Sequence, residues 1–188
     1  MVAVLNEDRH VGWVGNKISE RAPFPGEAIP LRIGRGNPSG YLRFLNTLAL
    51  DAEGAYLAVS TGTFGLYAGT EKDTCIVRYE YDREPQNRYP PAHLHIHGEL
   101  PAIEQLPRIA DRGRGLSDLH FPVGGRRFRP CLEDLVEFVI VEGIATPRKG
   151  WEAAIDEHRE NFQASQLRAA VRRHPEHAIE ILRTLDKI

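Results

Sequence analysis

The sequence is poor in cysteine, has no long apolar run and carries nearly balanced charge. Its 188 residues include two cysteines, Cys75 and Cys131, which form neither a Cys-x-x-Cys pair nor a disulfide framework. No run of about 18 apolar residues is present, so we expect no membrane-spanning segment. The first ten residues lack the basic start and apolar middle of a secretory signal, so we expect a cytoplasmic protein. A net charge of −2 excludes a globally basic surface, and any anion-binding surface must therefore be local.

What is present favours an α+β fold. Residues 1–40 are punctuated by proline and glycine and predict an irregular N-terminal arm. Residues 41–143 predict a core domain, in which short apolar runs divided by glycine and aspartate indicate an antiparallel β-meander of four to five strands. Residues 144–188 predict a helical extension that begins with Trp151 and restarts at Pro175.

One helix is predicted inside the core domain, from about residue 132 to residue 142. Its apolar residues recur at helical spacing: they are Leu132, Leu135, Val136, Val139 and Ile140. Glu133 and Asp134 lie in the first turn, where the helix dipole favours negative charge, and Gly143 can end the helix. We therefore expect the apolar stripe of this helix to cover the sheet.

The stretch PPAHLHIHGE, residues 90–99, contains three of the eight histidines at alternate positions. On a β-strand, side chains alternate between the two faces. We therefore expect Leu94 and Ile96 to face the core and the imidazoles to face solvent or a cleft. Imidazole titrates near neutral pH and serves as an acid, a base or a metal ligand. The candidate catalytic residues are His93, His95, His97 and His120. The central one, His95, is expected to matter most.

Arginines gather between residues 108 and 129, where six arginines and two aspartates give a local charge of +4. Guanidinium groups bind phosphate in a bidentate manner. The candidate phosphate-binding residues are Arg78, Arg126, Arg127 and Arg129. A solvated loop without function explains the same cluster equally well. Tyr79 and Tyr81 are expected to be core residues, because they share a strand face with Cys75 and Val77.

Three motifs between residues 48 and 140 resemble the TumE-type toxin family of bacterial toxin–antitoxin systems. They are VRYEYD at residues 77–82, PAHLHIHG at residues 91–98 and LEDLVEF at residues 132–138. The resemblance implies a small α+β toxin that cleaves RNA and that a cognate antitoxin protein silences. From the residues themselves we expect cleavage of single-stranded RNA by histidine acid–base catalysis without a metal. The chain departs from the family pattern in its N-terminal arm, its arginine-rich insertion and its two additional C-terminal helices.

The histidine stretch also resembles the opening of the histidine-triad motif of nucleotide hydrolases. That family continues with two apolar residues, where this chain has Gly98 and Glu99. The resemblance implies hydrolysis of a nucleotide phosphate, with His95 as the nucleophile. A non-enzymatic binding protein, of the immunity or antitoxin type, is a third hypothesis, and self-association into a homo-oligomer stays open.

A metal site is the alternative to catalysis without a cofactor. The spacing His-x-His-x3-Glu matches the first half of the cupin metal motif, whose second half is absent here. The ligand types suit zinc or manganese. The candidate ligands are His93, His95, His120 and Glu99.

Overall fold

The computed structural model describes residues 2–19, 21, 27–51, 54, 56–99, 115–124 and 129–188. The strands are β1 (Val2–Asn6), β2 (Val11–Gly15), β3 (Ile29–Arg32), β4 (Pro38–Leu50), β5 (Leu57–Tyr67), β6 (Cys75–Asp82), β7 (Ala92–Ile96) and β8 (Phe121–Pro122). The α-helices are α2 (Leu132–Val141), α3 (Trp151–Arg173) and α4 (Pro175–Thr184). Among the described residues, the short 3₁₀ helices η1 (Lys72–Thr74) and η3 (Leu116–Asp118) precede β6 and β8.

The strands form one antiparallel sheet in the order β1-β2-β4-β5-β6-β7-β8, with β3 paired to β4. The α+β class and the antiparallel meander are confirmed, but the sheet has eight strands rather than four to five. The added strands come mostly from the first 40 residues, which form β1, β2, β3 and the start of β4 instead of an irregular arm. Strands β2 and β3 are both stabilised by backbone hydrogen bonds to the 13-residue strand β4, along the edge that β5 does not occupy.

Helix α2 packs on the centre of the sheet and forms the main core. The buried cluster consists of Leu31, Leu42, Phe44, Phe64, Leu66, Leu135 and Val139. Leu132 and Val136 pack against this cluster from the same side of α2, so the predicted stripe is confirmed for four of its five residues, Ile140 being outside the cluster. The helix begins with a backbone cap, because the N–H of Cys131 donates to Asp134 Oδ2 at 2.8 Å.

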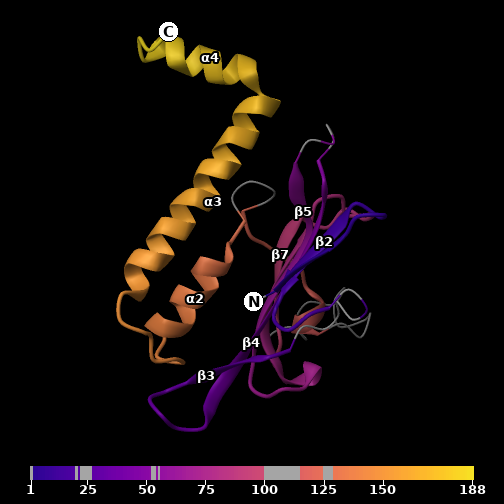
Figure 1. Ribbon diagram of the computed structural model, residues 1–188, viewed down its shortest axis with the longest axis vertical. Coiled ribbons are helices and arrows are strands. Elements are labelled where there is room, and N and C mark those ends of the chain that lie inside the picture. The colour runs from indigo at the N-terminus through magenta and orange to yellow at the C-terminus, as the bar shows by residue number, and fades with distance from the viewer. Residues whose placement is uncertain are drawn as a thin grey trace.

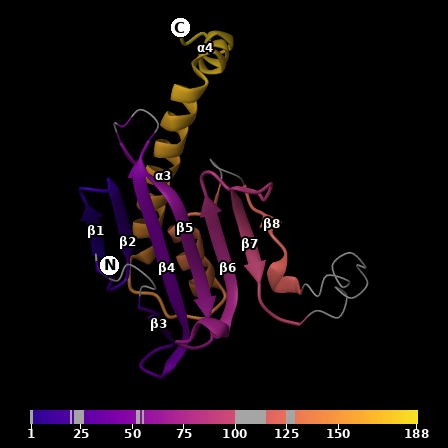
Figure 2. The ribbon, with the colours of Figure 1, turned by 90° about the vertical axis from the view of Figure 1, so that its right-hand side faces the viewer.

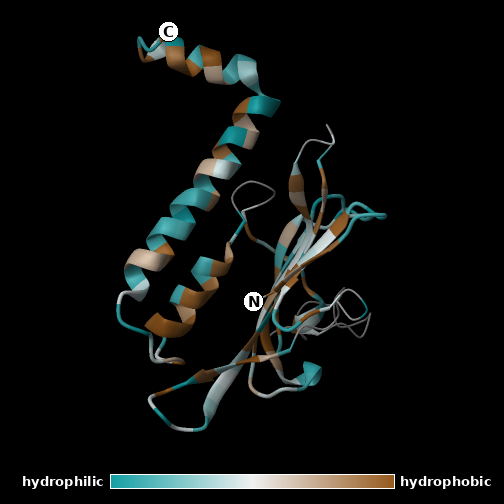
Figure 3. Ribbon diagram, in the orientation of Figure 1, coloured by the Kyte–Doolittle hydropathy of each residue, from teal (hydrophilic) through white to brown (hydrophobic). Residues whose placement is uncertain are grey.

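The C-terminal helices lie on the same side of the sheet as α2 (Figure 1, Figure 2). Figure 3 shows that α3 is mostly hydrophilic, and Ile155 is its one buried residue. Arg159 of α3 binds Asp134 and Glu137 of α2, so charge pairs join the two helices. Helix α4 buries none of its residues and extends away from the sheet. None of the helices within the described ranges is long and apolar enough to cross a membrane.

Candidate functional site

The pairing of β6 with β7 decides which side chains share a face. Directly opposite residues of antiparallel strands project on the same side of a sheet. Leu94 lies opposite Tyr79, and Tyr79 packs against the core beneath α2. His93 lies opposite Glu80, and Arg78 lies opposite His95, so these four side chains share the other face. The predicted alternation along β7 is confirmed, with histidines on one face and apolar residues on the other.

The predicted burial of this strand is wrong. His93 and His95 are only 7% and 5% exposed, whereas Ile96 is 37% exposed and Leu94 is half-buried. The histidine face is covered by a second segment, since the carbonyl oxygen of Ser117 in η3 contacts His95 and the His120 ring lies against His93 and His95. The buried core cluster beneath α2 takes its sheet residues from β3, β4 and β5, and Ile96 is outside it. The sequence pattern gave the correct faces, but it could not show which face a distant segment would cover.

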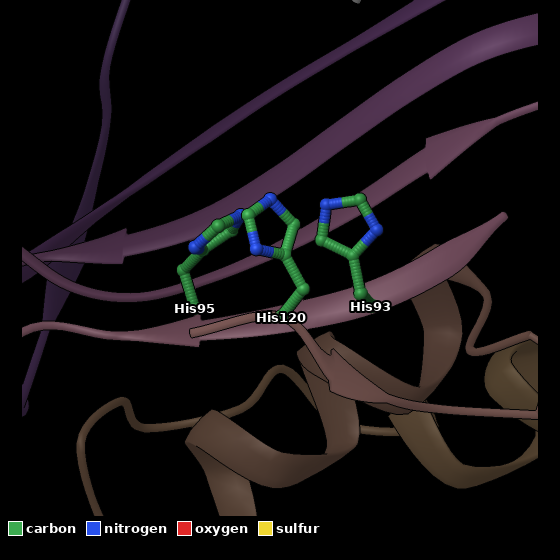
Figure 4. Close-up of side chains that lie close together, drawn as sticks. All are labelled: His93, His95 and His120. Atoms are coloured by element: carbon green, nitrogen blue, oxygen red, sulfur yellow. The ribbon is translucent and has the colours of Figure 1, made fainter. Parts of the chain in front are cut away.

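His120, just before β8, completes a cluster of three imidazoles. One ring nitrogen from each of His93, His95 and His120 lies within 4.8 Å of the others. Figure 4 shows the three rings gathered above β7. The ring centre of His120 is 4.6 Å from that of His93 and 4.5 Å from that of His95. Tyr89 stacks on His120 at 3.7 Å, and this partly exposed ring forms an outer wall of the cluster.

Each of the three imidazoles is oriented by the main chain. The Nδ1 atoms contact the carbonyl oxygens of Pro90 (His93, 2.9 Å), Ser117 (His95, 2.7 Å) and Asp118 (His120, 3.1 Å). A carbonyl oxygen only accepts hydrogen bonds, so these partners assign the proton to Nδ1 in every ring. In the neutral ring, Nε2 then carries a lone pair. The cluster can therefore accept protons or bind a metal ion through Nε2.

Glu80 extends the cluster toward Arg78. Its Oε2 atom lies 3.4 Å from Nε2 of His93 and 3.5 Å from Nε2 of His95. Its Oε1 atom lies 2.6 Å from Nε of Arg78. Both side chains of this ion pair are 31% exposed. The sequence interpretation missed Glu80, although the signal was present: Arg78 and Glu80 alternate with the core tyrosines on β6, and pairing with β7 brings them to the histidines.

His97 lies beyond the end of β7 and outside the three-imidazole cluster. Its backbone N–H donates to the carbonyl oxygen of Ile76 at 2.9 Å, which continues the strand pairing. Burial lowers the pKa of His97, and the charges of Arg78 and His95 lower it further. His97 is therefore a neutral neighbour of the cluster near pH 7.

Arg129 and Glu99 lie away from the cluster. Arg129 stacks on Tyr81 at 4.0 Å and on Phe162 of α3 at 5.3 Å, on the helix-covered face of the sheet. It therefore joins α3 to the sheet on the face opposite to the histidines. Glu99 is exposed and is not part of the metal-ligand group, whereas Glu80 is beside it. Arg126 and Arg127 lie outside the described residues.

Comparison with known proteins adds no relative. The chain matches no protein-family model, no curated protein and no solved structure. The resemblances to toxins and to histidine-triad hydrolases therefore stay predictions. The functional argument depends on the geometry of the cluster.

Proposed function

We propose that the protein cleaves phosphodiester bonds, with single-stranded RNA as its substrate, at the site formed by the three-imidazole cluster, Glu80 and Arg78. The observation that carries the proposal is the position of Arg78, whose guanidinium lies beside a carboxylate that itself faces two imidazoles. Cleavage of a phosphodiester requires a base for the attacking oxygen, an acid for the leaving oxygen and a cation for the phosphate. These three requirements match the chemistry of this one group of side chains.

The solvent exposure of each side chain indicates its role in the proposed site. His93 and His95 are buried, so a polymeric substrate cannot contact them without displacement of the covering segment. Glu80 and Arg78 are about one-third exposed and form the accessible rim of the site. We assign phosphate binding to Arg78 and removal of the proton of the attacking hydroxyl to Glu80, which faces two imidazoles. The imidazole group that receives this proton then acts as the acid and returns it to the leaving oxygen. Tyr89, 40% exposed and stacked on His120, is positioned to stack on an unpaired base.

The test is cleavage of a fluorogenic single-stranded RNA by the purified chain, with added zinc and without it. We expect Arg78→Gln to lower kcat/KM for RNA by about 100-fold or more, since one charge-stabilising donor contributes that much in other enzymes. Arg148→Gln, at an exposed residue distant in sequence, is the matched control and should leave the rate unchanged. A parent protein that cleaves no RNA under either condition would refute the proposal. Equal rates for Arg78→Gln and the parent would remove Arg78 from the site.

A further inference from the structure

We infer that the three-imidazole cluster is a binding site for one divalent transition-metal ion, zinc by ligand type, held by Nε2 of His93, His95 and His120 with Glu80 as the fourth ligand. The inference goes beyond the proposed function and is separate from it. A metal ion held by these four groups would occupy the proton acceptors that cleavage requires, so the proposed cleavage belongs to the metal-free chain. It differs from the metal site expected from sequence, in which Glu99 was the carboxylate.

The first argument is an excess of hydrogen-bond acceptors at one point. With Nδ1–H donated to the main chain, Nε2 of His93 and of His95 are acceptors, and both face Oε2 of Glu80 at 3.4 and 3.5 Å. A carboxylate and two imidazole lone pairs repel one another unless a cation lies between them. His93 is only 7% exposed, and its buried Nε2 atom has no hydrogen-bond partner. An unsatisfied buried nitrogen is unfavourable, and a bound metal ion would satisfy it.

The second argument is the orientation of the rings. Histidines that bind metals commonly donate their other ring N–H to a carbonyl or a carboxylate, which fixes both the tautomer and the ring plane. All three imidazoles of the cluster do so, and their three carbonyl partners are separate main-chain groups.

The third argument is distance and ligand type. Zinc–nitrogen bonds of about 2.0–2.1 Å in a tetrahedral site separate the ligand nitrogens by about 3.4 Å. One ring nitrogen of each histidine lies within 4.8 Å of the others, so a small rotation of the side chains would bring three ring nitrogens to this separation. Three imidazoles and one carboxylate suit zinc and other borderline ions, whereas calcium and magnesium prefer oxygen ligands. Arg78 pairs with the second oxygen of Glu80 and would hold that carboxylate toward the ion.

The experiment uses the full chain without a polyhistidine tag. The protein is stripped with a chelator, and Zn²⁺ is titrated by competition with a chromophoric chelator. Absorption of the Co²⁺ form then reports the coordination geometry. We expect one equivalent bound, a tetrahedral cobalt spectrum, and affinity lowered by about 100-fold or more in His120→Ala. His120 is half-buried on a covering segment, so its removal disturbs the sheet less than removal of His95, and circular dichroism confirms folding.

Two further variants make the result decisive. His177→Ala is the matched control, because His174 and His177 form an exposed pair, 6.1 Å between ring centres, that can bind metal adventitiously. Glu80→Gln should weaken Zn²⁺ by about 10–100-fold, which tests the fourth ligand without removing an imidazole. Loss of binding in His177→Ala alone, equal affinity in His120→Ala and the parent, or less than one equivalent on the parent would overturn the inference. Zinc binding without RNA cleavage would refute only the proposed function, and RNA cleavage by a chain that binds no zinc would refute only the metal site.

Discussion

Replacement of His95 by alanine should destabilise the protein even when no metal is present. The side chain is 5% exposed and lies between β7 and η3, and its Nδ1–H donates to the carbonyl oxygen of Ser117 at 2.7 Å. Loss of this hydrogen bond lowers the free energy of unfolding by about 1 kcal/mol. The cavity left by the ring and the carbonyl oxygen left without a donor lower it by about 2 kcal/mol more. With about 3 °C per kcal/mol for a chain of this size, we expect the melting temperature to fall by about 9 °C.

The assay is thermal unfolding in excess chelator, so that metal linkage does not contribute. His158→Ala is the control, because it removes an exposed imidazole from α3 and should change the free energy of unfolding by less than about 0.5 kcal/mol. A melting temperature for His95→Ala equal to that of the parent would show that the ring is not packed as described. The sequence alone predicted imidazoles that face solvent or a cleft, and removal of an exposed imidazole costs little stability. This measurement therefore separates the two interpretations.

Two further predictions concern stability and reactivity away from the site. Leu135→Ala should lower the free energy of unfolding by about 3 kcal/mol in urea, because Leu135 is 3% exposed in the core beneath α2. Phe138, on the other side of the same helix, is 42% exposed, so Phe138→Ala should lower the free energy of unfolding by less than about 1 kcal/mol. Equal losses for the two variants would show that Leu135 does not face the core. Burial raises the pKa of the Cys131 thiol from 9.0 to about 12, so its thiolate fraction at pH 8 should fall about 1,000-fold. Rapid reaction of native Cys131 with a thiol reagent at this pH would contradict its burial.

Local periodicity predicted the parts of the fold that depend on local sequence. The spacing from Leu132 to Ile140 gave a helix with the correct inward side, and the alternation of Leu94 with the histidines gave the faces of β7. The N-terminal strands were missed, because glycine- and proline-rich sequence weakens a strand signal and the pairing of β2 and β3 with β4 is set by the tertiary fold. Strand pairing also determines which residues form the site. Glu80 is 13 residues from His93 in sequence but lies directly opposite it in the sheet.

The reversed burial of β7 is itself an argument for function. An exposed histidine triplet would be an ordinary polar strand face, because water would satisfy every ring nitrogen. Here a covering segment excludes water from His93 and His95, and the buried Nε2 of His93 finds no hydrogen-bond partner. Burial of unsatisfied polar groups opposes folding, so apolar residues would stabilise this covered face better than imidazoles do. Functional sites are where chains depart from such stability rules. The covered face of β7, rather than the arginine-rich stretch that the sequence made prominent, is therefore where we place the chemistry of this protein.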